Sequence, residues 1–437
     1  MLKRVREIIL VFGDIALALA ALFLTVRIGF WESFNWLIFY KHFFPFIFLY
    51  FFWFLLFYIF GLYDLDLIRP KLEFLARTGE CFLACLGLGI GFFYLIPFFG
   101  ITPKTNLLIN ILIFGGLFSI WRRSFYYIFS SLFLERVAFL GKNSLSQKLA
   151  NQIKKNPQLG YKMIGFLDPR KNIFSQVKRK RIETLIIARE LNGKSKLTRD
   201  LYKCLLLKIN FLDLAKAYEI LFQKIPIDFV SQTWFLENLA EGEKKIYDKL
   251  KRAGDVILAI LMIIVSSPLW LIFSWLIKLE DKGPVFYTQK RVGKDRKEFF
   301  LWKFRSMKVG AEKEGGAKWA EKDDPRVTKI GKILRKIHLD ELPQMINVLK
   351  GDISLVGPRP ERPEFVKKLE KEIPHYHLRH IIKPGFTGWA QIKFRYARSL
   401  MDSHEKFQYD LYYIKNRSLT LDLGILLKTF QLLFKSE

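Results

Sequence analysis

The stretch Val256–Leu279 reads VILAILMIIVSSPLWLIFSWLIKL, and it is long enough for a helix that crosses a bilayer. Ser267 and Pro268 lie at its middle. Proline removes a backbone donor and crowds the carbonyl four residues earlier, so we expect the helix to break or kink at this pair. Cations flank both ends of the run, namely Lys249, Lys251, Arg252, Lys278 and Lys282. With cations on both sides, the positive-inside rule does not favour a single crossing of the membrane. We therefore expect a re-entrant helix over residues 256–279, with a fifth membrane crossing as the alternative.

Four upstream segments are apolar and long enough, or nearly so, to span a bilayer: Ile8–Val26, Phe43–Phe60, Cys81–Thr102 and Thr105–Trp121. Cations precede the first segment, separate the second from the third and follow the fourth: Lys3, Arg4, Arg6, Arg69, Lys71, Arg77, Arg122 and Arg123. The other connections are poorer in positive charge, so the positive-inside rule places both ends of these helices in the cytoplasm. We therefore expect residues 1–125 to form a transmembrane four-helix bundle.

The chain is rich in both apolar and basic residues. Hydrophobic residues make up 51% and aromatic residues 16% of its 437 residues, which is high for a soluble protein. The 70 Lys and Arg against 41 Asp and Glu give a formal net charge of +29, which favours anionic partners. Because this charge shares the chain with membrane segments, we expect membrane lipids and nucleotides as partners, and no nucleic acid.

The region after the fourth apolar segment has the pattern of a small α/β module. Arg136–Gly141 predicts a buried strand that enters a glycine turn, and Ser144–Lys154 predicts a helix. Tyr161–Leu167 and Thr184–Ala188 are further predicted strands. The order is that of half a Rossmann-type domain, but no second or third glycine follows Gly141, so the backbone cannot closely approach a pyrophosphate. We expect residues 136–235 to be a degenerate Rossmann-like cytoplasmic module, structural or regulatory rather than nucleotide-binding.

Two adjacent carboxylates, Asp340 and Glu341, precede a predicted helix over Leu342–Lys350 that ends at Gly351. Pro343 is tolerable only in the first turn of that helix, which places both carboxylates at or just before its N-terminus. Free N–H groups and the helix dipole favour anions there. The simplest alternative is that Asp340 is an N-cap and Glu341 a first-turn acid.

Five cations near turns or helix ends surround this pair along the sequence: Lys303, Arg305, Arg335, Arg359 and Arg395. Arginine's planar fork binds phosphate oxygens in pairs. Arg359 lies in the Gly-Pro-Arg-Pro turn of Ser354–Pro360, where two prolines reduce the entropy cost of fixing it. Two carboxylates among such cations fit a nucleophile that attacks phosphorus, together with a ligand for a divalent ion. The pattern predicts an enzyme that acts on a phosphorylated substrate at a lipid surface.

His375, His377 and His380 have the spacing H-x-H-x-x-H. A structural zinc site needs a fourth ligand, and the neighbouring sequence offers no clear one. We therefore expect these histidines to serve packing rather than metal binding.

From about Lys251 to the C-terminus the chain resembles the bacterial sugar transferase family, the monotopic polyprenyl-phosphate phosphoglycosyl transferases. The stretches that carry the resemblance are Lys251-Arg252-x-x-Asp255, Gly283-Pro284-Val285, Gln289-x-Arg291-x-Gly293, Lys303–Met307, Leu339–Gln344, Ser354–Pro360 and Lys383–Gly388. The upstream helices and degenerate module resemble the long members, which start exopolysaccharide or O-antigen repeat units. The resemblance implies a mainly α catalytic domain over residues 249–437, on the cytoplasmic face of the bacterial inner membrane.

The resemblance also implies site residues. Asp340 is then the nucleophile that attacks the sugar-bearing phosphorus of a UDP-sugar and releases UMP, before the phosphosugar passes to undecaprenyl phosphate. Glu341 matches the acid associated with Mg²⁺, and Ser267-Pro268 matches the helix break. The five cations named above match positions that cradle phosphates of the donor or the lipid.

Two other functions remain open on the sequence alone. One is a glycosyltransferase that makes a monophosphate-linked lipid sugar, and the other is a non-catalytic membrane scaffold for polysaccharide assembly. The sequence does not name the sugar, and it leaves open whether the protein is a homo-oligomer.

Overall fold

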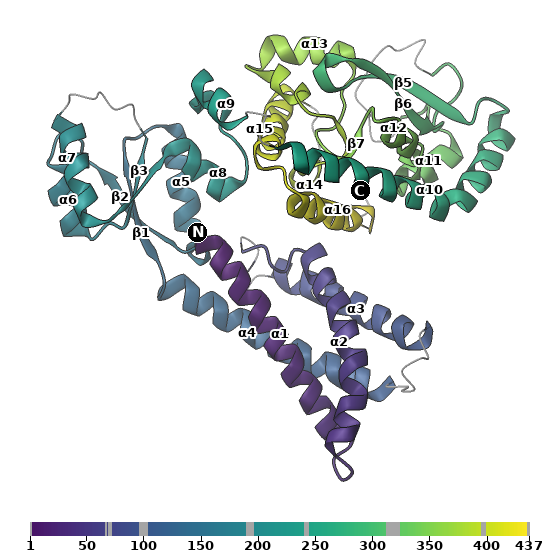
Figure 1. Cartoon of the computed structure of the whole chain (residues 1–437), viewed down its shortest axis with the longest axis horizontal. Coiled ribbons are helices and arrows are strands. Elements are labelled where there is room, and N and C mark those ends of the chain that lie inside the picture. The colour runs from purple at the N-terminus through teal and green to yellow at the C-terminus, as the bar shows by residue number, and fades with distance from the viewer. Residues whose placement is uncertain are drawn as a thin grey trace. The chain divides into compact units, whose positions relative to one another are not determined.

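The computed structural model describes residues 2–65, 68, 72–95, 104–188, 196–239, 244–311, 324–394 and 399–434. The chain divides into two compact units, Met1–Ala217 and Tyr218–Glu437. Helices dominate both units, and a small parallel sheet lies in the first (Figure 1). Within the described residues, five helices are long and apolar enough to cross a membrane. The chain is therefore a membrane protein.

The first unit begins with the helices α1 (Leu2–Gly29), α2 (Trp36–Ile59), α3 (Leu72–Leu95) and α4 (Lys104–Ser131). They confirm that the four upstream apolar segments are helical, although residues 96–102 of the third lie outside the described residues. Aromatic side chains fill their interior, where Phe57 stacks on Phe114 with ring centroids 5.9 Å apart. Buried Asp14 of α1 pairs with Arg122 of α4 at 2.7 Å, so the two helices carry a matched ion pair.

The sheet of the first unit has four parallel strands in the order β2-β1-β3-β4. The strands are β1 (Glu135–Leu140), β2 (Tyr161–Leu167), β3 (Thr184–Ile187) and β4 (Asn210–Asp213), and they alternate with α5 (Ser144–Lys155), α6 (Ile173–Lys180), α7 (Lys196–Cys204) and α8 (Leu214–Phe222). The predicted strands and helix of this region are confirmed. Asn143 and Ser146 cap the N-terminus of α5 reciprocally: the side chain of each accepts a hydrogen bond from the backbone N–H of the other. These two N–H groups, which a phosphate loop would offer to a phosphate, are therefore already bonded within the chain.

A buried arginine joins the apolar helices to the sheet of the same unit. Arg6 of α1 donates hydrogen bonds of 2.9 Å to the carbonyls of Phe129 and Gln158, and a further one to the carbonyl of Phe133. Gly160 packs against the guanidinium, and its φ of 97° lies in the left-handed region. A side chain at residue 160 would both strain the backbone and displace Arg6.

The second unit packs its helices and two small sheets around two apolar clusters, a larger one that includes Leu355 and Phe407 and a smaller one that includes Phe273 and Phe304. Its elements before the candidate site are η4 (Ile227–Phe229), α9 (Gln232–Asn238), α10 (Lys245–Asp281), the antiparallel pair β5 (Phe286–Val292) and β6 (Glu298–Phe304), and α11 (Lys329–Lys336). The later ones are η7 (Leu339–Glu341), α12 (Gln344–Lys350), β7 (Ser354–Val356), α13 (Pro363–Glu372), η8 (Tyr376–His380), β8 (Gly385–Thr387), α14 (Trp389–Lys393), α15 (Leu400–Asn416) and α16 (Leu419–Phe434). Buried Ile225 and Phe235 belong to the core formed with Leu355 and Phe407, so the segment before α10 is part of this unit.

Helix α10 continues as an α-helix through Pro268. The Ser267 hydroxyl donates a bond of 2.8 Å to the carbonyl of Ile264, which is the acceptor that proline leaves without a backbone donor. A serine hydroxyl therefore replaces the backbone donor that the proline lacks. The helix is not interrupted there, so the expected break at Ser267 and Pro268 is wrong, because the serine hydroxyl satisfies the freed carbonyl; the re-entrant path of the chain stays a prediction.

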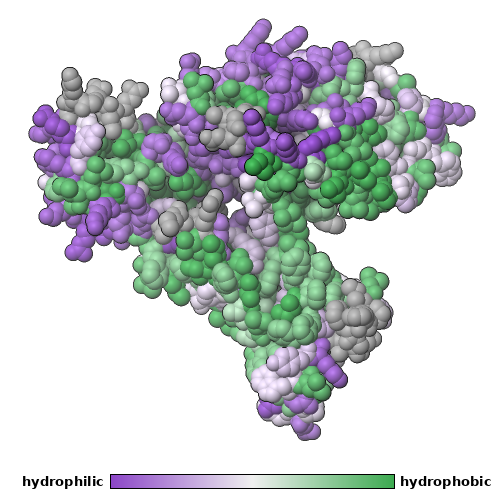
Figure 2. Space-filling model, in the orientation of Figure 1, coloured by the Kyte–Doolittle hydropathy of each residue, from purple (hydrophilic) through white to green (hydrophobic). Residues whose placement is uncertain are grey.

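Helix α10 turns a continuous apolar face outward. The exposed side chains along it include Ile257, Leu261, Ile264, Val265, Leu271 and Trp275. In Figure 2 hydrophobic residues gather along α10, whereas those over α13 on the opposite side of the unit are mostly hydrophilic. An exposed apolar surface of this kind indicates contact with lipid or protein.

Both ends of α10 are fixed to the same unit. Near the start, Arg252 donates bonds of 2.6 and 2.8 Å to the carbonyls of Val348 and Leu349. At the end, Asp281 pairs with Arg305, which immediately follows β6. The helix is therefore held at both ends, while its middle presents the apolar face.

Candidate active site

The two adjacent carboxylates lie in the single turn η7, directly before α12. Pro343 is the N-cap residue of α12, and Gly351 ends that helix with a φ of 87°. The predicted place of the pair, just before a short helix that ends at Gly351, is confirmed. Asp340 is not the N-cap of α12, because Pro343 holds that position.

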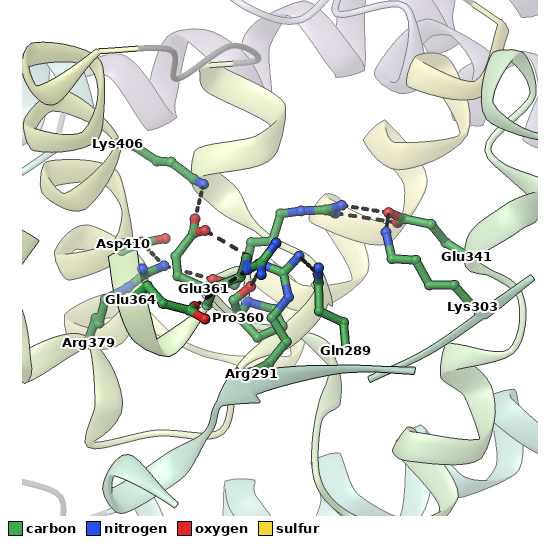
Figure 3. A network of polar contacts seen from close by, with 12 residues as sticks. Gln289, Arg291, Lys303, Glu341, Pro360, Glu361, Glu364, Arg379, Lys406 and Asp410 are labelled. Atoms are coloured by element: carbon green, nitrogen blue, oxygen red, sulfur yellow. Dashed lines mark hydrogen bonds and ion pairs between the residues drawn. The ribbon is translucent and has the colours of Figure 1, made fainter. Parts of the chain in front are cut away.

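Glu341 is bound by two cations. Its Oε1 lies 2.7 Å from Lys303 Nζ and 2.5 Å from Arg359 Nη2, and its Oε2 lies 3.4 Å from Arg359 Nη1 (Figure 3). Burial alone would raise the pKa of Glu341, but the charges of Arg359 and Lys303 hold that pKa well below its usual range. In turn, Glu341 raises the pKa of Arg359. The structure thus brings three predicted site residues into one ionised cluster.

Asp340 is 8% exposed, and no described residue donates a hydrogen bond to its carboxylate. Burial raises the pKa of Asp340, whereas the positive charge of Lys303 opposes that shift. A carboxylate without hydrogen-bond donors keeps its lone pairs available for attack. Within the part of the chain that the structure describes, Asp340 is therefore the carboxylate of the pair that accepts no hydrogen bond, while Glu341 is engaged.

Close backbone contact builds the turn that carries Arg359. Strand β7 pairs in parallel with β8, so the stretches Ser354–Pro360 and Lys383–Gly388 lie side by side. A Cβ on Gly385 would come within 2.0 Å of the Gly357 nitrogen, and a Cβ on Gly388 within 2.2 Å of the Gly357 oxygen. The glycines in the two stretches are required for this approach.

A second group of charged residues lies beside this turn, and sequence reasoning did not assign it to the site (Figure 3). Glu361 lies 2.9 Å from Lys406 Nζ, and Asp410 lies 3.1 Å from Arg379 Nη2. Burial alone would raise the pKa of Glu361, but Lys406, Arg379 and Arg291 lower it to about 2. Glu361 could have been suspected because it directly follows the Gly-Pro-Arg-Pro motif. For Arg379, Lys406 and Asp410 the sequence contains no comparable signal.

The remaining predicted cations differ in their surroundings. Arg335 donates a hydrogen bond of 2.9 Å to the Ser306 hydroxyl and contributes positive charge at Asp340. Arg305 is 6% exposed and donates a hydrogen bond to Asp281 at the end of α10, rather than to Asp340 or Glu341. Arg395 lies outside the described residues.

The described residues contain no group of three or more His, Cys, Asp or Glu side chains that could hold a metal ion. His380 is buried, and His375 stacks near Phe235 with ring centroids 4.7 Å apart. Mg²⁺ is commonly held by one or two carboxylates together with substrate phosphates and water, so Glu341 would fit this ion only once Lys303 or Arg359 turns from its oxygens to the phosphates.

The second unit is similar to proteins of known family. Residues 246–436 match the family described as bacterial sugar transferase. The UDP-N-acetylgalactosamine-undecaprenyl-phosphate N-acetylgalactosaminephosphotransferase of Aeromonas hydrophila is 44% identical over 233 residues, which are 53% of this chain and 54% of that protein. The UDP-glucose:undecaprenyl-phosphate glucose-1-phosphate transferase of Xanthomonas campestris pv. campestris is 31% identical over 320 residues, which are 68% of this chain and 66% of that protein.

A third relative is shorter in its match to this chain. The exopolysaccharide production protein PSS of Rhizobium leguminosarum bv. phaseoli is 40% identical over 187 residues, which are 41% of this chain and 92% of that protein. The chain thus covers most of this relative, and between half and two thirds of the two others. The family match includes α10, the carboxylate pair and its cations. On this evidence the chain belongs to the bacterial sugar transferase family.

Proposed function

We propose that this chain transfers a sugar 1-phosphate from a UDP-sugar to undecaprenyl phosphate and releases UMP, as the first membrane step of exopolysaccharide or O-antigen synthesis. The Aeromonas and Xanthomonas relatives are named for a UDP-sugar and undecaprenyl phosphate, which supports this pair of substrates. The observation that carries the proposal is the buried Asp340 beside Glu341, which Lys303 and Arg359 bind.

The reaction proceeds in two displacements. An Asp340 carboxylate oxygen attacks the sugar-bearing phosphorus, the bond from that phosphorus to the bridging oxygen breaks, and UMP leaves with this oxygen. A phosphate oxygen of undecaprenyl phosphate then attacks the same phosphorus and releases the Asp340 carboxylate. Lys303, Arg335 and Arg359 supply positive charge where the phosphate oxygens accumulate negative charge. Arg305 and Arg395 stay predicted phosphate ligands.

Magnesium is part of the proposal. Glu341 would hold Mg²⁺ together with donor phosphates, and the ion would neutralise phosphate charge when bound. The two cations that already bind Glu341 keep its carboxylate ionised, as a metal ligand must be.

The contacts of α10 support a re-entrant helix. A helix that crosses the bilayer would carry Arg252 and Asp281 to opposite faces of the membrane. Their partners Val348 and Arg305 belong to one compact unit, which cannot lie on both faces. We therefore propose that α10 bends at Pro268 in the membrane, dips into one leaflet and returns. The catalytic residues then lie on the cytoplasmic face of the bacterial inner membrane, where a soluble nucleotide sugar meets a lipid phosphate.

We further propose that α1 to α4 form a transmembrane four-helix bundle over residues 1–125. The segment 136–235 is then a cytoplasmic Rossmann-like module and residues 249–437 the catalytic domain. The parallel sheet and its self-capped helix α5 support a structural or regulatory role for the module rather than nucleotide binding.

Nucleotide release by purified protein tests the activity. The protein is given a panel of UDP-sugars with undecaprenyl phosphate and Mg²⁺, and we expect UMP as the nucleotide product. Exchange of labelled UMP into the UDP-sugar without the lipid acceptor reports the covalent step. Asp340→Asn is expected to slow both reactions at least about a thousandfold, whereas Asp295→Asn, at an exposed position, leaves them unchanged. UDP as the product would indicate the glycosyltransferase instead, and no turnover with any donor would favour the scaffold.

Cysteine labelling tests the topology. The natural cysteines Cys81, Cys85 and Cys204 are buried and are first replaced by alanine. A cysteine at exposed Lys297 is expected to react only with reagents that enter the cytoplasm. A cysteine at exposed Glu32, between α1 and α2, is the control that reacts from outside. Labelling of Lys297→Cys from outside would overturn the re-entrant path.

A further inference from the structure

The turn that carries Arg359 is held at every residue from Gly357 to Glu361. The Gly357 N–H donates to the carbonyl of Thr387 at 2.8 Å, and the Pro358 carbonyl accepts from the Gly385 N–H at 2.9 Å. The Glu361 carbonyl accepts from the Val292 N–H at 3.0 Å. These three bonds come from backbone groups, and they fix the two ends of the turn.

The two central carbonyls of the turn are held by arginine side chains. Arg379 Nη2 donates to the Arg359 carbonyl at 2.9 Å, and Arg291 Nη1 donates to the Pro360 carbonyl at 3.0 Å. Prolines at 358 and 360 cannot donate backbone hydrogen bonds, so the turn has few bonds of its own. The orientation of the Arg359 backbone therefore depends on the two guanidiniums that reach it from outside the turn.

Arg379 is itself fixed by buried partners. Its Nη2 lies 3.1 Å from Asp410 Oδ2, both side chains are 3% exposed, and its Nη1 donates to the Tyr376 hydroxyl. Burial alone would lower the pKa of Arg379, but Tyr376 and Asp410 raise it, so the guanidinium stays charged. A buried, charged side chain that three hydrogen bonds hold within the protein is not available to bind a substrate. Arg379 can nevertheless act on the substrate site through the Arg359 carbonyl.

We propose that Arg379 is a positioning residue of the transfer reaction: it fixes the backbone of Arg359, so that the Arg359 guanidinium binds Glu341 and meets the donor phosphates beside Asp340. The effect of Arg379 on the reaction rests on the proposed function, whereas its contact with the Arg359 backbone does not. Arg291 supports the same turn at Pro360 and is tied to it further through Glu361, whose Oε2 lies 3.8 Å from Arg291 Nη1. Misplacement of a cation by about 1 Å can cost roughly a hundredfold in rate.

Coupling between residues 359 and 379 tests the proposal. Arg379→Gln is expected to lower kcat/KM for the UDP-sugar roughly tenfold to a hundredfold. If Arg379 acts through Arg359, the double variant Arg359→Gln/Arg379→Gln is no slower than Arg359→Gln alone. Effects that multiply in the double variant would overturn the proposal, because they would show that Arg379 acts independently of Arg359.

Two variants separate positioning from a general loss of folding. Removing Arg379 leaves the buried Asp410 charge unpaired, which by itself destabilises the protein. The double variant Arg379→Gln/Asp410→Asn is therefore measured as well. It is expected to be more stable than Arg379→Gln and to show the same loss of kcat/KM. Arg417→Gln removes another largely buried arginine, which pairs with Asp248 at 3.0 Å. It is expected to lower stability and leave kcat/KM of the folded enzyme unchanged. Equal rate losses in both arginine variants would contradict a specific role for Arg379.

Hydrogen exchange gives a readout that does not depend on turnover. The amides that hold this turn, those of Gly357, Gly385 and Val292, are expected to exchange faster in Arg379→Gln than in wild type, and not in Arg417→Gln. Unchanged exchange in this turn would overturn the proposal even if the wild-type enzyme proved inactive with every donor. Absence of UMP release from wild type, with faster exchange in Arg379→Gln, would instead overturn the proposed function and leave the structural role of Arg379 standing.

Discussion

The carboxylate of Asp255 on α10 accepts a hydrogen bond of 2.7 Å from the hydroxyl of Ser354, the first residue of β7. A second bond, from the Leu355 N–H to the same carboxylate, measures 3.2 Å. Strand β7 leads directly into the turn that carries Arg359. The apolar helix and the candidate active site are therefore joined by a buried polar contact.

Asp255→Asn is expected to destabilise the protein by about 1–3 kcal/mol, because it disrupts two hydrogen bonds to a buried carboxyl group. A shift of the thermal unfolding midpoint in detergent measures this loss. Glu298→Gln, in a surface ion pair with Lys290 whose two side chains are 49% and 61% exposed, serves as the control and should change stability by less than about 0.5 kcal/mol. Equal midpoints for wild type and Asp255→Asn would refute the joining role.

Glu341→Gln should lower the rate of UMP release at least about a hundredfold. The substitution removes the charge that orients Lys303 and Arg359, and it weakens the predicted Mg²⁺ ligand. Glu364→Gln is the matched control, because that carboxylate is 60% exposed in its pair with Arg362. A rate for Glu341→Gln within about threefold of wild type would contradict the cluster's role in transfer.

Two glycines should respond in opposite directions to alanine. A Cβ on Gly331 of α11 would lie 2.0 Å from the Ser306 oxygen, so Gly331→Ala is expected to cost about 1–3 kcal/mol. A Cβ on Gly254 of α10 meets nothing within 4 Å, and Gly254→Ala is expected to gain about 0.5–1 kcal/mol from helix propensity. Thermal unfolding of the two variants side by side measures both, and a destabilised Gly254→Ala would show that this helix position is constrained by more than its local conformation.

His380 should make stability fall in mild acid. Burial, with the charges of Arg379 and Arg296, lowers the pKa of His380 from 6.5 to about 3, although a backbone hydrogen bond to Gly293 opposes the shift. Below pH about 6.5 the imidazole of His380 is protonated in the unfolded chain, whereas in the folded chain it stays neutral until pH about 3. Protonation therefore favours the unfolded chain between these two pH values, so the free energy of unfolding is highest above pH 6.5 and falls as the pH is lowered.

Comparison with His380→Gln measures this effect. Well below pH 6.5 the difference in unfolding free energy between wild type and variant should change by about 1.4 kcal/mol per pH unit, in favour of the variant. Denaturation series between pH 7 and pH 5 provide the slopes, and other titrating groups cancel in the difference. Parallel slopes would mean that His380 accepts its proton in the folded protein.

Local pattern was sufficient to find some elements of this protein, although β5, β6, α13 and α15 were not predicted. The apolar runs predicted the helices, the strand order predicted the parallel sheet, and the Pro343 and Gly351 positions predicted the short helix after Asp340 and Glu341. These features follow from backbone geometry and burial over a few neighbouring residues, which a sequence displays directly. The predicted start of α12 at Leu342 was wrong by two residues, because Pro343 is its N-cap and Gln344 its first residue.

The partners of the site were decided by the tertiary structure. The sequence predicted the same role, phosphate binding, for Lys303, Arg305, Arg335 and Arg359. In the structure Lys303 and Arg359 bind Glu341, whereas Arg305 binds Asp281. Which cation pairs with which carboxylate depends on the strand and helix ends that the fold brings together. Electrostatic attraction depends on the distance between the charges in space and not on their separation in the sequence. By itself the sequence determined the membrane helices, the small sheet and the carboxylate pair, because these are local. Only the tertiary structure decided that Asp340 is buried without a described donor, that Glu341 is engaged, and that Arg379 holds the Arg359 backbone, because each depends on contacts between distant segments.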